Sequence, residues 1–205
     1  MVSYRSNAER AARLAGIARV VQADLSRAED RTRLLDAARD LYGLAVFCGD
    51  PARVSHAAQL EEQMRRSYEV NYMGPVLLAR EAAGRMRERG AEGAIVLLGT
   101  MQAGAVFAGS TAYAGAKAAL VAAARVLAKE CRGENIRVNV VSPGVTAAGM
   151  AEASIASGKY ERYTREKIVT RYGAAADVAR AVRFFLEPDN YVTGQVLAVD
   201  GGLTL

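Results

Sequence analysis

The chain has 205 residues, of which 51% are hydrophobic and 24% are charged, so it is long enough for one domain with a buried core and too short for two large ones. The net charge of +5 comes almost entirely from arginines scattered over helical stretches, and an arginine-rich coding bias explains it better than nucleic-acid binding does. The only histidine is His56, which argues against a histidine-based metal site and a Ser-His-Asp triad.

In the N-terminal half, short aliphatic runs alternate with longer helical patterns, which is typical of β-α-β units on a parallel sheet. The predicted elements in this half are a strand at 2–6, a helix at 7–15 capped by Asn7 and Gly16, a strand at 17–23, a helix at 27–41 and a strand at 44–48. Residues 60–89 predict one long helix, which bends at Gly74-Pro75 because proline removes a backbone donor.

The C-terminal half continues the same alternation. It predicts a strand at 94–98, a helix at 111–129, a strand at 136–142, a helix at 177–185 and a strand at 195–199. Residues 147–172 are richer in Ser, Gly, Lys and Tyr, and we expect a mobile insertion or lid on the substrate side. The whole chain is therefore expected to form one α/β domain, residues 1–205, with a parallel sheet between helical layers.

The strongest chemical signal is Tyr113 followed by Lys117 in a predicted helix. A spacing of four places both side chains on one helix face, where an ammonium could stabilise a phenolate and lower the tyrosine pKa from about 10 toward neutrality. Such a tyrosine could serve as a general acid or base.

Two further polar residues could face the same space. Thr100 follows the strand 94–98, and the carboxyl ends of parallel strands face the ligand crevice, although a strand-end residue can equally bond the backbone. Asn71 lies among apolar neighbours in the long helix, where its amide could bond a carbonyl at the bend, hold a water or lie on the surface.

These residues resemble the Asn-Ser-Tyr-Lys tetrad of the short-chain dehydrogenase/reductases, and other motifs of that family occur in its order. They are Asp24-Leu25, Asn71 with Gly74, Thr100, Tyr113 with Lys117, residues 139–144 (NVVSPG), 191–195 (YVTGQ) and 199–202 (VDGG). The resemblance is greatest to the 3-ketoacyl-carrier-protein reductase type and covers nearly the whole chain. It implies a Rossmann-like three-layer αβα fold.

The resemblance also implies roles for individual residues. Tyr113 would donate a proton to a substrate carbonyl, Thr100 would orient that carbonyl, Asn71 would anchor a relay water, and Lys117 would bond the nicotinamide ribose. The cofactor would be NADP(H), with Arg5 and Ser6 at its 2′-phosphate and Asp24 at its adenine. Those three residues are equally well explained by ordinary strand-end polarity. The remaining cofactor contacts would be Gly49, Pro143 and Gly144.

The chain also departs from the family pattern. No family-type first strand or Gly-x-x-x-Gly-x-Gly loop precedes residues 2–6, and that loop lets backbone amides approach the pyrophosphate, so dinucleotide binding is in doubt. The motif after the strand 44–48 keeps only Gly49, and Ala148 stands where a nicotinamide-binding threonine is usual. Either strands 2–6 and 44–48 pair directly in a six-stranded sheet or another chain fills the position between them, and we predict direct pairing.

Three functions stay open from the sequence. The first is a ketoreductase-like oxidoreductase acting on an acyl or polyketide-like substrate, free or carrier-bound. The second is a cofactor-independent dehydratase, isomerase or cyclase that uses Tyr113 and Lys117, and the third is a non-catalytic subunit paired with a full-length family member. Family members pack their two long helices against copies, so a homo-oligomer is expected.

Several absences are expected as well. Cys48 and Cys131 lie far apart in the sequence, which favours free thiols in a reducing compartment. No stretch reads as a signal peptide or a transmembrane helix. We therefore expect a cytoplasmic protein with no metal, no membrane attachment and no nucleic-acid partner.

Overall fold

A computed structural model describes residues 1–52 and 59–205, so His56 lies outside the described residues. The strands are β1 (Val2–Tyr4), β2 (Val20–Gln22), β3 (Gly43–Val46), β4 (Gly93–Leu98), β5 (Ile136–Pro143) and β6 (Val196–Val199). The α-helices are α1 (Ala8–Ala12), α2 (Ala28–Ala37), α3 (Leu60–Tyr68), α4 (Gly74–Glu88), α5 (Thr111–Cys131), α6 (Glu152–Ala156), α7 (Glu161–Arg165) and α8 (Ala175–Leu186). Single turns are η2 (Glu69–Met73), η3 (Met101–Ala103), η4 (Arg132–Glu134) and η5 (Gly149–Ala151).

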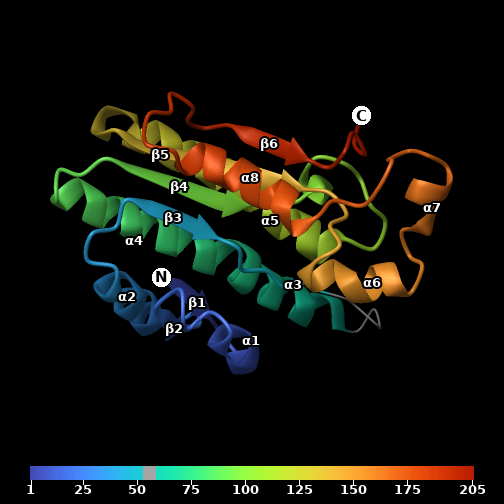
Figure 1. The fold of residues 1–205 in the computed structure, drawn as a ribbon, viewed down its shortest axis with the longest axis horizontal. Coiled ribbons are helices and arrows are strands. Elements are labelled where there is room, and N and C mark those ends of the chain that lie inside the picture. Colours follow the sequence, from blue (N-terminus) through green and yellow to red (C-terminus); the bar gives the residue numbers. More distant parts are fainter. Residues whose placement is uncertain (53–58) are drawn as a thin grey trace.

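Four strands form a parallel sheet in the order β3-β4-β5-β6, with helices on both faces (Figure 1). Ile95 and Leu97 of β4 belong to a core cluster with α4 and α5, whereas Val96 between them packs in a second cluster with α8. Successive strand residues point to opposite faces, so these clusters mark the two sides of the sheet. The three-layer α/β architecture predicted from the sequence is confirmed.

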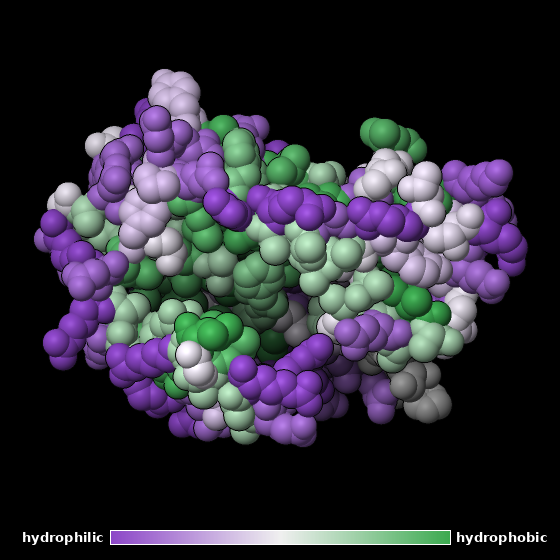
Figure 2. Space-filling view, viewed as in Figure 1, coloured by the Kyte–Doolittle hydropathy of each residue, from purple (hydrophilic) through white to green (hydrophobic). Residues whose placement is uncertain are grey.

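The predicted direct pairing of the first and third strands is wrong. β1 pairs only with β2, in register Val2 with Val20, and this two-stranded sheet is separate from the sheet that begins at β3. Figure 1 shows the N-terminal strands and helices alongside β3 as a distinct unit. In Figure 2, hydrophobic residues gather in the recessed middle of this face, with hydrophilic residues around it.

Side-chain contacts between α2 and α4 attach the N-terminal unit to the rest of the molecule, together with the core residues Leu34 and Leu35 of α2. Arg31 of α2 donates to Glu81 of α4 at 3.0 Å and to the carbonyl of Leu25 at 2.9 Å, and its own side chain is almost fully buried. A second ion pair joins Arg85 to Asp36 at 2.6 Å. The N-terminal unit is therefore held by helix contacts, at a position where β1 makes no ladder with β3.

The long predicted helix 60–89 is interrupted before its proline. α3 ends at Tyr68, the turn Glu69–Met73 is π-helical, and Pro75 lies in the first turn of α4. The helix continues through this point, since the amide of Gly74 donates to the carbonyl of Glu69 in the π-helical turn, and proline itself has no N–H to leave unpaired. A π-helical turn inserts one residue and often lies at a functional site, and here it carries Asn71.

The first helix is also shorter than predicted. Asn7 caps α1 as expected, since its side chain accepts a hydrogen bond from the amide of Arg10 at 2.9 Å, but the helix ends at Ala12 with Arg13 rather than Gly16 as its C-cap. Across residues 1–52 and 59–205, no helix has the length and apolarity needed to cross a bilayer.

Candidate active site

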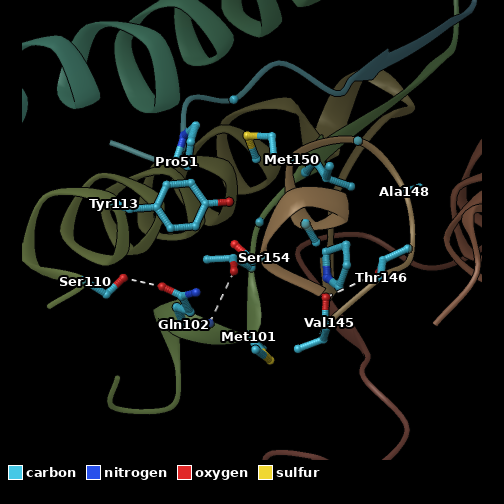
Figure 3. A pocket seen from close by; sticks show the side chains of 18 of the residues that line it. Pro51, Met101, Gln102, Ser110, Tyr113, Val145, Thr146, Ala148, Met150 and Ser154 are labelled. Atoms are coloured by element: carbon cyan, nitrogen blue, oxygen red, sulfur yellow. Dashed lines mark hydrogen bonds between the residues drawn. The ribbon is translucent and has the colours of Figure 1, made fainter. Parts of the chain in front are cut away.

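A cavity of about 670 Å³ opens at the carboxyl ends of the central strands. Its wall is built by the loops after β3, β4 and β5, the start of α5, and the segment from Ala148 to Tyr160 (Figure 3). This edge of an open parallel sheet is where ligands bind in α/β proteins. Within the described ranges, no group of three or more His, Cys, Asp or Glu side chains could hold a metal ion.

Tyr113 and Thr100 are brought together at this cavity, as the sequence predicted. Both residues line it, and Figure 3 shows the Tyr113 ring extending into the space between the surrounding loops. Thr100 is the N-cap of η3, where its hydroxyl accepts the amide of Gln102 at 3.4 Å. The position of Thr100 is therefore set by the end of β4 and that of Tyr113 by the first turn of α5.

The expected lowering of the Tyr113 pKa is wrong. Burial raises the pKa of this phenol, and Tyr160 raises it further, whereas a hydrogen bond with Thr100 opposes the shift without cancelling it. Lys117 is not among the groups that act on it. Desolvation disfavours the charged form, so the Tyr113 phenol keeps its proton at neutral pH. The geometry gives a proton donor rather than a phenolate.

Lys117 lies behind the cavity wall and is only 2% exposed. Its ammonium donates to the carbonyl of Leu98 at 2.7 Å and, at 3.3 Å, to that of Cys48, which ties the ends of β4 and β3 together. Burial lowers the pKa of this amine to about 8, because the charged form loses its water. Lys117 and Tyr113 share a helix face, as their spacing predicts, but the Lys117 ammonium donates to the carbonyls at the ends of two strands.

Asn71 is fully buried, which excludes the surface position considered for it. Its amide nitrogen donates to the Asp50 carbonyl and to the Ser67 hydroxyl, both at 2.9 Å, and its oxygen accepts the Asp50 amide at 2.8 Å. Ser67 in turn donates to the carbonyl of Ala112 in the first turn of α5. Asn71 does not line the cavity, and it fixes the loop after β3 against the helix that carries Tyr113.

The residues expected to contact a cofactor divide into two groups. Gly49, Pro143 and Gly144 line the cavity. Arg5, Ser6 and Asp24 lie in the N-terminal unit and are not among the lining residues.

The local bonds of the second group fit strand-end polarity. The Asp24 carboxylate accepts bonds from the amide and hydroxyl of Ser26, and the Arg5 carbonyl accepts one from Gln22. Gly144 has a packing reason of its own, since a Cβ there would approach the Cα of Asp200 to 2.7 Å.

The polar lining residues that were not found from the sequence include Gln102, Ser110, Lys159 and Tyr160. Ser110 donates to Gln102 on the same wall as Tyr113, and Lys159 and Tyr160 come from the predicted insertion. Ser110 stands three residues before Tyr113, which could have placed it near the site, whereas no sequence pattern distinguishes the other three. The segment 147–172 therefore contributes residues to the cavity wall.

Comparison with known proteins agrees with this geometry. A family model described as enoyl-(acyl carrier protein) reductase matches residues 1–204. The solved structure of a short chain dehydrogenase/reductase family protein covers 98% of this chain and 84% of its own, with a TM-score of 0.85 and 30% identity. The chain belongs to the short-chain dehydrogenase/reductase family. The resemblance deduced from the sequence is thus confirmed, and this short-chain dehydrogenase/reductase is an oxidoreductase by family.

Two curated relatives illustrate the range of that family. The NADPH-dependent aldehyde reductase 2 of Arabidopsis thaliana chloroplasts is 32% identical over 91% of this short-chain dehydrogenase/reductase and 71% of its own length. A 3-oxoacyl-[acyl-carrier-protein] reductase of Rattus norvegicus is 38% identical over 70% of this chain and 58% of its own. Both relatives are named as reductases of carbonyl compounds.

Proposed function

We propose that the protein reduces a carbonyl group of an acyl or polyketide-like substrate and that Tyr113 supplies the proton. One observation carries this proposal. The Tyr113 phenol, which burial keeps protonated, and the Thr100 hydroxyl lie near each other on the wall of a cavity large enough for a small molecule. The names of the relatives support a carbonyl substrate.

The chemistry follows from two donors on one wall. A substrate carbonyl oxygen next to Tyr113 and Thr100 would accept a hydrogen bond from each hydroxyl. As that oxygen gains negative charge, the bonds strengthen, and the phenol proton transfers to give the alcohol. Little reorganisation is needed, because the ends of β4 and α5 already hold both donors in place.

The hydride for this reaction would come from NADPH, which supplies two electrons to the carbonyl carbon when bound. The chain fits the nicotinamide end. Gly49, Pro143 and Gly144 line the cavity beside Tyr113, and an ammonium has three N–H donors, of which Lys117 uses two on carbonyls. Lys117 lies behind the cavity wall, so its part in this site is to hold the strand ends at Leu98 and Cys48.

At the adenosine end of NADPH, the fit depends on Arg5 and Ser6, two exposed residues after β1 that could bond the 2′-phosphate. The 205 residues contain no Gly-x-x-x-Gly-x-Gly loop for the pyrophosphate. The proton donor on the cavity wall is also compatible with a second candidate, a cofactor-independent dehydratase, isomerase or cyclase in which Tyr113 moves a proton and substrate fills the whole cavity.

Calorimetric titration of the purified chain with NADPH and NADH separates the two candidates. Micromolar binding supports the reductase, and no binding at millimolar concentration overturns it. Tyr113→Phe removes the proton donor with little change in shape, and Tyr191→Phe, at a fully exposed position outside the cavity, is the matched control. We expect NADPH-dependent reduction of an acetoacetyl thioester to be lost in the first variant and kept in the second. Equal activity in both would exclude Tyr113 as the donor.

We further propose that the protein is a homo-oligomer. Leu60, Met64 and Tyr68 of α3 are between 38% and 46% exposed and recur every four residues, so they form one apolar stripe on the helix surface. Val126 of α5 is exposed as well. Apolar side chains gathered on such a stripe suit contact with a second copy of this chain.

A further inference from the structure

The wall of the cavity is almost entirely uncharged. Phe47, Met101, Phe107, Met150 and Val178 make much of it apolar, and polar groups cluster around Tyr113. Among the described lining residues, Lys159 is the only one with a charged side chain, and no Asp or Glu lines the cavity there. A single cation in an apolar cavity can favour a ligand with a negative charge, because no carboxylate on the cavity wall competes for the cation.

The backbone holds Lys159 in a defined place. Gly158 has a φ of +76°, which ends the turn after α6, and the amide of Lys159 then donates to the carbonyl of Ser154 at 3.1 Å. The ammonium nitrogen lies 5.6 Å from the centroid of the Tyr160 ring. That contact favours a cation over the ring face.

The same ring connects the cation to the reacting group. Tyr160 lines the cavity and lies close enough to Tyr113 to act on its phenol electrostatically. Lys159, Tyr160 and Tyr113 all line this one cavity. Lys159 makes no ion pair with any carboxylate in the described part of the chain. Its charge is available to a ligand in the cavity.

We propose that Lys159 binds an anionic group of the substrate while its carbonyl lies at Tyr113. The substrate would then be an oxo compound with an apolar chain between the carbonyl and a negatively charged end. This inference names the substrate class of the site and rests on the proposed function for the role of Tyr113 only. The anion could be the carboxylate of a free oxo acid or the phosphate of a carrier's pantetheine arm.

The test measures binding without turnover. The purified chain is titrated by calorimetry with 6-oxoheptanoate and with its neutral amide, and the titrations are repeated with Lys159→Gln and Lys129→Gln. Lys129 is an exposed lysine of α5 that does not line the cavity, so its variant removes the same charge elsewhere. A third ligand, acetoacetyl pantetheine phosphate, distinguishes the phosphate source from the carboxylate source.

We expect Lys159→Gln to weaken binding of the anionic ligand about five-fold, as befits a partly exposed ion pair, and to leave the amide unchanged. Lys129→Gln should change neither. The proposal is overturned if Lys159→Gln loses affinity equally for the acid and the amide, or if it loses no affinity for any anion. It is also overturned if the unaltered chain binds no anion at millimolar concentration. If binding follows this pattern but Tyr113→Phe leaves catalysis intact, the anion site stands and the proposed reaction fails.

Discussion

The buried amine of Lys117 should make the stability of this protein rise with pH over a defined window. Its pKa falls from an ordinary 10.5 in the unfolded chain to about 8 in the native state. Between those values the unfolded chain binds more protons than the native one, so raising the pH favours the native state. For this single group, linkage gives a gain in the free energy of unfolding of about 1.3 kcal/mol between pH 7 and pH 9.

Urea denaturation at half-unit steps from pH 7 to pH 9 measures that gain. Lys117→Met removes the titrating group and should abolish the rise, whatever its effect on absolute stability, whereas Lys129→Met should keep it. Burial also raises the pKa of the Cys48 and Cys131 thiols, and a thiol that keeps its proton longer in the native state has the opposite effect near pH 9, so the gain is measured as the difference between wild type and Lys117→Met. An identical pH slope in wild type and Lys117→Met would refute the reasoning.

Two further outcomes follow from the structure. Asn71→Ala should lower the free energy of unfolding by about 2–4 kcal/mol in urea titrations, because the buried amide and carbonyl of Asp50 lose their partner, and a loss below that of the exposed cap variant Asn7→Ala would contradict this role. The apolar stripe on α3 should make the chain larger than a monomer in solution scattering, and Met64→Glu should shift that mass toward the monomer; a monomeric wild type would exclude the oligomer.

Strong local patterns made much of the fold predictable. The buried strand 94–98 is a continuous aliphatic run, as expected of a parallel strand covered on both faces, strand 136–142 is aliphatic apart from Arg137, Asn139 and Ser142, and α5 is a long alanine-rich helix. The way in which the N-terminal sheet is attached to the main sheet was not predictable. It depends on contacts such as the ion pair between Arg31 and Glu81, two residues that are far apart in the sequence.

The sequence predicted which residues lie at the site better than it predicted their chemistry. Sequence spacing placed Tyr113 and Thr100 at one cavity. It could not show that the Lys117 ammonium would donate to strand-end carbonyls, or that burial would raise the pKa of the Tyr113 phenol. Those outcomes depend on desolvation, which only the packed structure defines. Lys159 was missed for a similar reason, since it comes from a segment whose sequence carries no periodic pattern.

The separation of β1 and β2 from the main sheet bears on how the molecule opens. A strand inside one continuous ladder can leave only when many backbone bonds break together, whereas residues 1–41 are joined to the rest by side chains, both core residues such as Leu34 and Leu35 and ion pairs such as Arg85 with Asp36. Such a region can unfold as a cooperative unit of its own while the four-stranded sheet stays native. Salt, which screens ion pairs, would weaken only the ionic part of this attachment and leave the apolar part, which includes Leu34 and Leu35, in place.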